Sequence, residues 1–186
     1  MTSSGYVDAA WPLADYQTVF ARVPGSAEMA SAGRPFTEDL VLSLIARGVE
    51  FAPVVLHTGF SSQEAGESPQ AEYVAVPRHT ADVVNAVIER GGRVVAVGTT
   101  ATRAIESAAV GGRVTAAQGW TDRVVTPDDP PRVVRGLITG WHDEAASHLL
   151  LVEAVAGADL AQRAYDAALR EGYAWHEFGD SGLFLP

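Results

Sequence analysis

The sequence predicts an α/β protein in which a mainly parallel sheet is flanked by helices. Segment 92–107 has the pattern of a strand, a glycine turn and a helix. Apolar, β-branched runs alternate with segments of helical length along most of the chain. Polar residues gather where the predicted strands end. Such alternation is typical of parallel sheets, because parallel neighbours need a crossover connection that is usually a helix.

Segment 92–107 is the most informative stretch. Residues 93–97 form a short apolar run of the kind found in strands buried on both faces. Gly98 interrupts this run, and Thr99 or Thr100 can cap the helix that follows. A junction of this kind brings backbone N–H groups and the positive end of a helix to one point. It suits an anion or a polar ligand, although by itself it indicates no particular reaction.

The other elements are predicted from their boundary residues. Thr37 is placed as an N-cap, with Glu38 and Asp39 in the first turn of a helix that ends at Gly48. Glycine and proline bound most of the remaining segments. We expect further helices over residues 80–90, 145–156 and 158–170, and strands over residues 17–21, 49–56, 73–76 (an edge strand), 121–126, 133–138, 173–178 and 183–185.

The length of 186 residues suits one domain with a substantial core. Residues 1–15 are weakly patterned, and we interpret them as a tail or a cut linker. Residues 16–186 are expected to form a single α/β domain.

Composition limits the partners. Thirteen arginines, no lysine and 23 acidic residues give a net charge of −10, which should repel a polyanion unless the arginines cluster. The absence of cysteine excludes disulfides, thiolate zinc sites and cysteine nucleophiles. No apolar stretch approaches the roughly 20 residues that a bilayer requires, and no secretory signal is visible. We therefore expect a cytoplasmic protein without a membrane partner.

Four polar clusters follow predicted strands. In parallel α/β sheets, ligands bind beyond the carboxyl ends of the strands, so we expect at least three clusters to converge on one crevice. The alternative is that these residues only form turns. The clusters are His57-Thr58-Gly59, Gly98-Thr99-Thr100, Thr139-Gly140-Trp141-His142 and Gly179-Asp180-Ser181.

Three residues in these clusters could take part in chemistry. His142 beside Trp141 could hold a planar base, because an aromatic ring and an imidazole are adjacent; alternatively, Trp141 packs in the core and His142 is solvated. His57 could exchange a proton near neutral pH or be structural. Asp180 could bind a hydroxyl pair or act as a base, and a turn-capping role is the alternative.

The remaining candidates are weaker. Arg103 would add charge to an anion site if it faced the Thr99-Thr100 turn, although its spacing from Glu106 favours a surface pair. The other histidines are interpreted as structural: His79, His148 and His176. No two histidines have the spacing of metal ligands, so no metal is expected.

At these residues the chain resembles the S-adenosylmethionine:tRNA ribosyltransferase-isomerases of queuosine biosynthesis. Residues 95–107 follow the family pattern nearly residue for residue, and shorter matches occur in order from about residue 16 to the end. These matches are Tyr16-Gln17-Thr18, Pro24-Gly25-Ser26, Ala32-Gly33 with Phe36-Thr37, Leu56-His57 with Gly59, Gly119 with Thr121-Asp122, Gly136 to Thr139 with His142, Ser147 with Leu149-Leu150, Ala154 with Gly157, and Tyr173 with Gly179-Asp180.

The resemblance implies a two-domain protein with an α/β barrel-like domain and a small inserted β-barrel. The chain matches only the later half, which implies a partial barrel-like α/β domain without the inserted barrel. The implied enzyme transfers the ribosyl part of S-adenosylmethionine to a 7-aminomethyl-7-deazaguanine base in tRNA. The ribose rearranges to an epoxycyclopentanediol, and adenine and methionine leave. S-adenosylmethionine is then the ribosyl-donor substrate, and no metal is required.

We accordingly place the catalytic role on His142 and Asp180. Transfer to tRNA would involve a full-length parent protein, because the acidic charge of this chain disfavours nucleic acid. The residues expected to bind substrate are His57, Gly98, Thr99, Thr100, Arg103, Thr139 and Trp141.

The chain departs from the family at several loops. The family's Gly-Leu-His-Phe reads Gly33-Arg34-Pro35-Phe36, and its Thr-Asn-Phe-His-Leu-Pro loop continues here from Thr139 as Gly-Trp-His-Asp-Glu. Gly-Thr-Phe is replaced around residues 60–62, and histidines are missing before Glu72-Tyr73. These changes are compatible with two alternatives. The protein is a relative that acts on another substrate, or it is a non-catalytic nucleoside-binding module or inactive fragment. A missing half would expose apolar surface, so we expect self-association.

Overall fold

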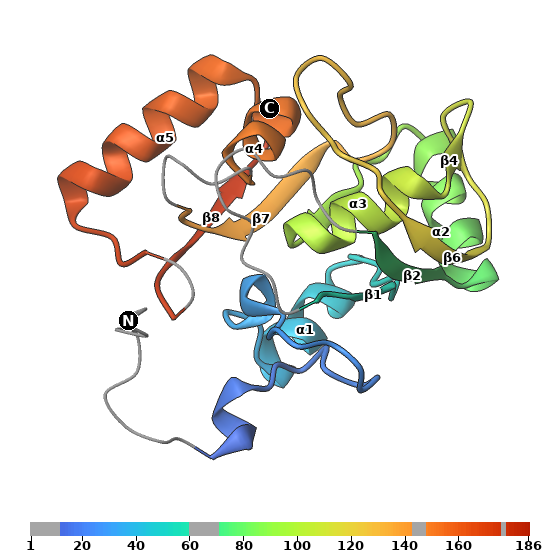
Figure 1. Cartoon of the computed structure of the whole chain (residues 1–186), viewed down its shortest axis with the longest axis horizontal. Helices are drawn as coiled ribbons and strands as arrows, with labels where there is room; N and C mark the ends of the chain where they lie inside the picture. Colours follow the sequence, from blue (N-terminus) through green and yellow to red (C-terminus); the bar gives the residue numbers. More distant parts are fainter. Residues whose placement is uncertain (1–11, 60–70, 143–147, 176–177) are drawn as a thin grey trace.

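The computed structural model describes residues 12–59, 71–142, 148–175 and 178–186. Two small sheets and a hairpin are combined with helices, which confirms the α/β class (Figure 1). The described strands form open sheets and not a closed barrel. Within the described part, no helix is long and apolar enough to span a membrane. The expected division at residue 15 stays a prediction.

The first sheet is antiparallel throughout. It contains β1 (Val55–His57), β2 (Glu72–Val76) and β6 (Ala117–Thr121) in the order β1-β2-β6. The prediction that residues 73–76 form an edge strand was wrong, because β6 pairs with the second side of β2. The strand expected over residues 121–126 is instead β6, which ends at Thr121, so the prediction began where the strand ends.

The second sheet contains β3 (Val95–Val97), β7 (Gly136–Gly140) and β8 (Ser181–Phe184) in that order. β3 and β7 are parallel, and β7 and β8 are antiparallel. The prediction of a mainly parallel arrangement was therefore wrong for all described pairs except β3 with β7. Alternation of strands with helices predicts crossovers, but it does not determine the direction in which the chain re-enters a sheet.

The helices are close to their predicted positions. Thr37 Oγ1 accepts a hydrogen bond from the Leu40 backbone N–H at 3.1 Å, which confirms the N-cap of the first helix. Residues 145–147 of the fourth predicted helix lie outside the described residues. The helices are α1 (Glu38–Ala46), α2 (Arg78–Glu89), α3 (Thr99–Ser107), α4 (His148–Ala156) and α5 (Ala158–Glu171).

Other predicted strands are absent from the described part or shorter. Residues 17–21 are not in a strand, and only Val19 and Phe20 among them form a turn. Residues 173–175 and 178 are not in a strand either, and residues 176–177, including His176, lie outside the described residues. Short elements that the sequence did not predict are η1 (Leu13–Tyr16), η2 (Ser31–Gly33), β4 (Ala109–Val110) and β5 (Arg113–Val114).

The core lies between the second sheet and helices α3, α4 and α5. Leu137 of β7 and Val152 of α4 are fully buried at its centre. Helix α3 contacts strands of both sheets and so connects them. In Figure 1 it lies between β7 on one side and β1 and β2 on the other. This position places the first turn of α3 at the end of the second sheet.

Candidate functional site

Three of the four polar clusters meet at one end of the second sheet. The Gly98 N–H donates to the Ile138 carbonyl at 2.8 Å, so the Gly98-Thr99-Thr100 turn lies beside the end of β7. Gly140 is paired with Ser181 in the register of β7 and β8, which brings the Asp180-Ser181 turn to the same end. The Asp180-Ser181 turn lies at the start of the antiparallel strand β8 and not at the end of a parallel strand. The start of an antiparallel strand lies at the same edge of the sheet as the end of its neighbour β7.

The first turn of α3 is shaped by Gly98. Its φ of 100° lies in a region that glycine adopts at little cost, and the residue is the N-cap without a side-chain cap. Thr99 and Thr100 are therefore the first two helical residues, and the prediction that one of them caps the helix was wrong. Backbone N–H groups in a first helical turn have no acceptor within the helix. Thr99 is buried and Thr100 is partly exposed at this turn.

His142 is held by hydrogen bonds. Its Nε2 lies 3.0 Å from Thr139 Oγ1, and both side chains are buried. Its backbone N–H donates to the Tyr165 hydroxyl at 3.4 Å. The His148 ring lies 4.6 Å from the His142 ring, centroid to centroid. The alternative of a solvated His142 was therefore wrong, because this imidazole is built into the end of β7.

Sequence reasoning missed Tyr165 and interpreted His148 only as structural, although both residues lie against His142. Burial raises the pKa of the Tyr165 hydroxyl, although its hydrogen bond from the His142 backbone lowers it in part. The hydroxyl is therefore protonated across the neutral range. Neither residue stands in a cluster at a strand end, so only the packing of α4 against β7 and of α5 against α4 could reveal them.

Trp141 packs in the aromatic core. Its ring lies 5.1 Å from the Tyr165 ring and 5.9 Å from the rings of Tyr173 and Phe184, and the side chain is buried. These contacts agree with the alternative interpretation, in which Trp141 packs in the core. A role for Trp141 in holding a base stays a prediction.

Asp180 is part of a turn. Its Oδ2 accepts a hydrogen bond from the Ala174 N–H, and its own N–H donates to the Ala174 carbonyl, both at 2.8 Å. Gly179 fits this turn only without a side chain, because a Cβ would lie 2.2 Å from two backbone carbonyl oxygens. The structure thus gives Asp180 a turn-forming contact, and its side chain is exposed at the same edge as His142.

Arg103 points away from the anion site that the sequence suggested. Its guanidinium pairs with Glu72 of β2, and its Nε donates to the Arg123 carbonyl at 3.0 Å. Burial raises the pKa of the Glu72 carboxyl, and the Arg103 charge opposes this effect. Arg103 therefore fastens α3 to the first sheet.

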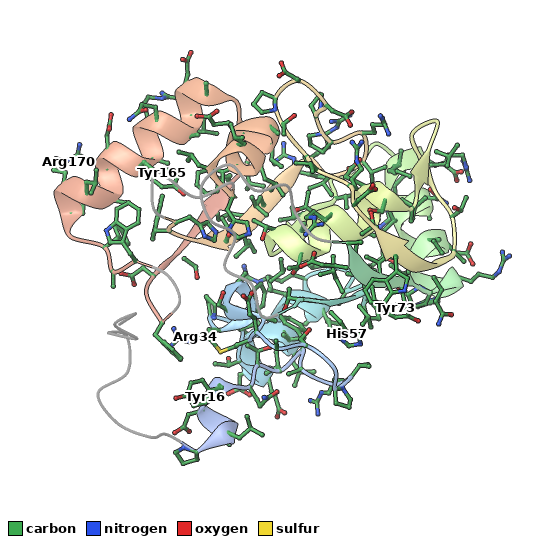
Figure 2. The ribbon with its side chains drawn as sticks, in the orientation of Figure 1. Tyr16, Arg34, His57, Tyr73, Tyr165 and Arg170 are labelled. Atoms are coloured by element: carbon green, nitrogen blue, oxygen red, sulfur yellow. The ribbon has the colours of Figure 1, made fainter. Side chains whose placement is uncertain are left out.

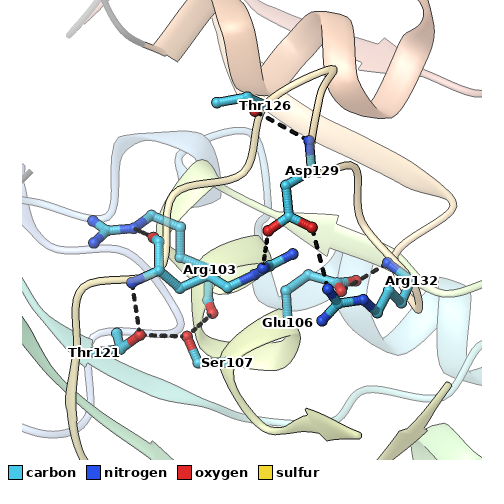
Figure 3. A network of polar contacts seen from close by, with 8 residues as sticks. Arg103, Glu106, Ser107, Thr121, Thr126, Asp129 and Arg132 are labelled. Carbon is cyan, nitrogen blue, oxygen red and sulfur yellow. Dashed lines mark hydrogen bonds and ion pairs between the residues drawn. The ribbon is translucent and has the colours of Figure 1, made fainter. Parts of the chain in front are cut away.

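Glu106 does not form the expected surface pair with Arg103 either. Figure 3 shows its carboxylate among the polar contacts around α3. It is almost fully buried and accepts the backbone N–H groups of Arg132, Val133 and Val134 at 2.7–2.8 Å.

His57 belongs to the first sheet and not to the edge formed by the three clusters. Ser26 Oγ lies 3.4 Å from His57 Nδ1, and the Tyr73 ring stacks against the imidazole at 5.9 Å. A Cβ on Gly25 would lie 2.9 Å from the ring, so the loop lies directly on it. The His57 and Pro24-Gly25-Ser26 matches in the sequence therefore form one contact.

Other features of the described residues add little chemistry. Their His, Asp and Glu side chains do not form a group of three that could hold a metal ion. A hollow of about 320 Å³ between α4 and α5 includes Tyr165 and the acidic residues Glu153 and Asp166, but none of the strand-end clusters.

Comparison with known proteins decides the family. The family model described as "Queuosine biosynthesis protein" matches residues 2–184. The chain belongs to this queuosine biosynthesis family. The resemblance seen in the sequence is thereby confirmed.

Relatives in this family are named S-adenosylmethionine:tRNA ribosyltransferase-isomerase. The chain is 38% identical to the protein of Carboxydothermus hydrogenoformans over 177 residues and 40% identical to that of Moorella thermoacetica over 178 residues. Each match covers 91% of this chain and 52% of the relative. The chain therefore spans about half the length of the curated family members that it matches.

A solved structure in the family has the same fold. The crystal structure of an S-adenosylmethionine tRNA ribosyltransferase from Thermotoga maritima matches with a TM-score of 0.71 and 37% sequence identity. The match covers 83% of this chain and 52% of that one. The queuosine biosynthesis fold is thus retained despite the altered loops.

Proposed function

We propose that this chain is part of a tRNA ribosyltransferase-isomerase of the queuosine pathway. In this reaction the ribosyl moiety of S-adenosylmethionine is transferred to a 7-deazaguanine base in tRNA and isomerised. The observation that carries the proposal is the meeting of the α3 first turn, His142 and the Asp180 turn at one end of the second sheet. Membership of the family supports it.

The first turn of α3 would bind a polar or anionic part of S-adenosylmethionine. Backbone N–H groups at Thr99 and Thr100 lie at the positive end of the helix, where negative charge is favoured, whereas the Gly98 N–H already donates to the Ile138 carbonyl. The two threonine hydroxyls can donate or accept further hydrogen bonds. We leave Arg103 out of this binding site, because its guanidinium is already paired with Glu72.

His142 is the proposed proton-transfer residue. Thr139 orients its ring through Nε2, and Tyr165 holds its backbone. An imidazole can accept or donate a proton near neutral pH. Asp180 at the same edge is the second candidate base, and its turn contact with Ala174 would position it. Trp141 would act through packing, because its ring is in the core.

The tRNA partner and a cytoplasmic location belong to this proposal. Relatives carry tRNA in their names, and modification of tRNA would take place where tRNA is found. The net charge of −10 makes broad phosphate contact by this chain alone unfavourable. We therefore place most backbone contacts with tRNA in the half of the relatives that this chain does not cover.

A non-catalytic nucleoside-binding module is the second candidate function. The departures from the family at loops such as Gly33-Arg34-Pro35-Phe36 favour it, because changes in loops can remove catalysis while the fold is retained. Release of adenine and methionine from S-adenosylmethionine separates the candidates. The enzyme should release both in the presence of tRNA that carries the deazaguanine base, and the binding module should release neither.

Calorimetry tests the binding site. S-adenosylmethionine should bind to the unchanged chain, and the double variant Thr99→Val/Thr100→Val should lose this binding while its unfolding transition is retained. Thr115→Val, on the loop after β5, is the matched control and should bind normally. No heat from either S-adenosylmethionine or adenosine at millimolar concentration would count against a nucleoside site. Unchanged affinity in the double variant would place the site elsewhere.

A further inference from the structure

Arg34 follows a segment that packs against the edge where the three polar clusters meet. This segment, η2, contacts β7. Ala32 of η2 also lies against the turn before α3, since a Cβ on Gly98 would be 3.6 Å from the Ala32 Cβ. Ala32 and Gly33 are buried, whereas Arg34 is exposed. The chain therefore places an exposed cationic side chain directly beside a segment that borders the candidate site.

The Phe178 ring fixes the direction of the Arg34 side chain. The Arg34 Cζ atom lies 5.0 Å from the ring centroid, within the range of about 6 Å for a cation–π contact. The Tyr16 ring packs edge-on to the Phe178 ring, with the centroids 5.5 Å apart. Figure 2 labels Arg34 near the turn that precedes β8. The guanidinium thus has a preferred position, and its planar set of N–H donors is ordered before a ligand arrives.

Phe178 brings Arg34 to the Asp180 turn. Phe178 and Asp180 are two residues apart, so their Cα atoms are separated by at most about 7 Å. Ser181 follows Asp180 and pairs with Gly140 at the end of β7. The same edge therefore carries a guanidinium and an exposed carboxylate, beside the first turn of α3.

These two opposite charges indicate the kind of ligand. A guanidinium can donate two parallel hydrogen bonds to a carboxylate or a phosphate, and the positive end of α3 favours the same negative charge. A phosphate has negative charge alone, so the Asp180 carboxylate would repel it. An α-amino acid group has an ammonium beside its carboxylate. It therefore suits an edge that carries both charges.

We propose that Arg34 binds the carboxylate of the methionine part of S-adenosylmethionine. This inference rests on the proposed function, which makes S-adenosylmethionine the substrate. It adds a binding residue that sequence reasoning did not place in the site. A residue in this role discriminates between ligands that carry the carboxylate and ligands that lack it.

Calorimetry with the whole chain tests this assignment. Arg34→Gln should weaken the binding of S-adenosylmethionine about tenfold, the loss expected for one charge-assisted contact. It should not weaken the binding of adenosine or of decarboxylated S-adenosylmethionine, because neither has the carboxylate. Arg34→Lys should bind S-adenosylmethionine with intermediate affinity, since an ammonium keeps the charge without the planar set of donors.

Arg78→Gln is the matched control. It removes the same charge from the exposed first residue of α2, and it should bind all three ligands as the unchanged chain does.

Equal affinity of Arg34→Gln and the unchanged chain for S-adenosylmethionine would overturn the inference and leave the proposed function intact. An equal loss for all three ligands would also overturn it, because Arg34 would then support the fold and not the carboxylate. If the unchanged chain bound none of the three ligands, the proposed function would fail together with the inference.

Discussion

At the scale of single residues, the polar side chains of α3 show how position in the fold decides their role. Arg103 and Glu106 are three residues apart, a spacing that favours a weak surface pair. Instead they contact different parts of the molecule, since Arg103 pairs with β2 and Glu106 accepts three backbone N–H groups. These partners come from distant segments, so the residues around α3 in the sequence could not reveal them.

Glu106 is predicted to be essential for stability. Glu106→Ala should reduce the free energy of unfolding by roughly 3 kcal/mol or more, because three buried N–H groups would lose a charged acceptor. Glu106→Gln should cost less, since its amide oxygen can still accept from Val133 and Val134. Urea unfolding monitored by circular dichroism measures both values.

The control for this comparison is Glu89→Ala. Glu89 pairs with Arg113 on the surface, where both side chains are about 60% exposed, and such pairs contribute less than about 1 kcal/mol. A loss at Glu106 as small as the loss at Glu89 would contradict the buried-acceptor role.

At the scale of elements, local signals located the helices well and the strands less well. Thr37 caps α1 as predicted, and α5 differs from its predicted range by one residue. Capping and helical periodicity act within a few residues, so they can be seen in sequence. The strand predicted over residues 49–56 is only Val55–His57, because pairing with β2 decides its length.

The loop between β6 and β7 is tied by an ion pair that gives a pH prediction. The Arg123 guanidinium hydrogen-bonds to Asp129 and holds the pKa of that carboxyl below its usual range, with a smaller contribution from Arg132. A lowered pKa in the folded state means that the stabilisation is present above the ordinary carboxyl pKa. It is lost as the pH falls through the lowered value.

Asp129→Asn should therefore destabilise the protein at pH 7, and the difference from the unchanged chain should shrink as the pH falls below about 3.8, the ordinary pKa. Chemical denaturation at several pH values measures this difference. Asp128→Asn, the neighbouring carboxylate, is the control and should show little difference at any pH. If the difference in unfolding free energy between Asp129→Asn and the unchanged chain grew as the pH fell, the lowered pKa of Asp129 would be contradicted.

At the scale of the whole molecule, α1 is an apolar helix without a buried residue. Leu42 is 63% exposed and Ile45 is 50% exposed. The relatives of this chain are about twice as long as the segment it matches. Exposed apolar surface on a helix favours association, because burial removes it from water.

We therefore predict that the chain self-associates through α1. The mean mass in sedimentation velocity should rise with concentration, and Leu42→Glu should shift the population toward monomer. Val110→Glu introduces the same charge at an exposed position on β4 and should leave the association unchanged. A single monomeric species across the concentration range would show that the exposed helix face is stable in water.

The candidate site contains three of the four polar clusters that the sequence predicted, and His57 lies elsewhere. These three clusters meet at one edge of the second sheet, namely Gly98-Thr99-Thr100, Thr139 to His142 and Asp180-Ser181, and their convergence on one crevice stays a prediction. The first two clusters lie at the ends of strands, as predicted. Asp180-Ser181 instead begins β8, so it reaches this edge through the antiparallel pairing of β8 with β7 and not through the strand predicted over residues 173–178. His57 lies on the other sheet, because its strand pairs with β2 and not with β3 or β7.

By itself, the sequence determined the α/β class, the positions of the helices, the glycine turn before α3 and the resemblance to the family, since all of these depend on local order along the chain. The fold as a whole sets the direction of the strands, buries His142 against Thr139, pairs Arg103 with Glu72 and leaves Trp120 exposed. The physical reason is that pairing and burial depend on contacts between residues far apart in the chain. Those contacts are chosen by the energy of the whole fold and not by the preference of any one segment.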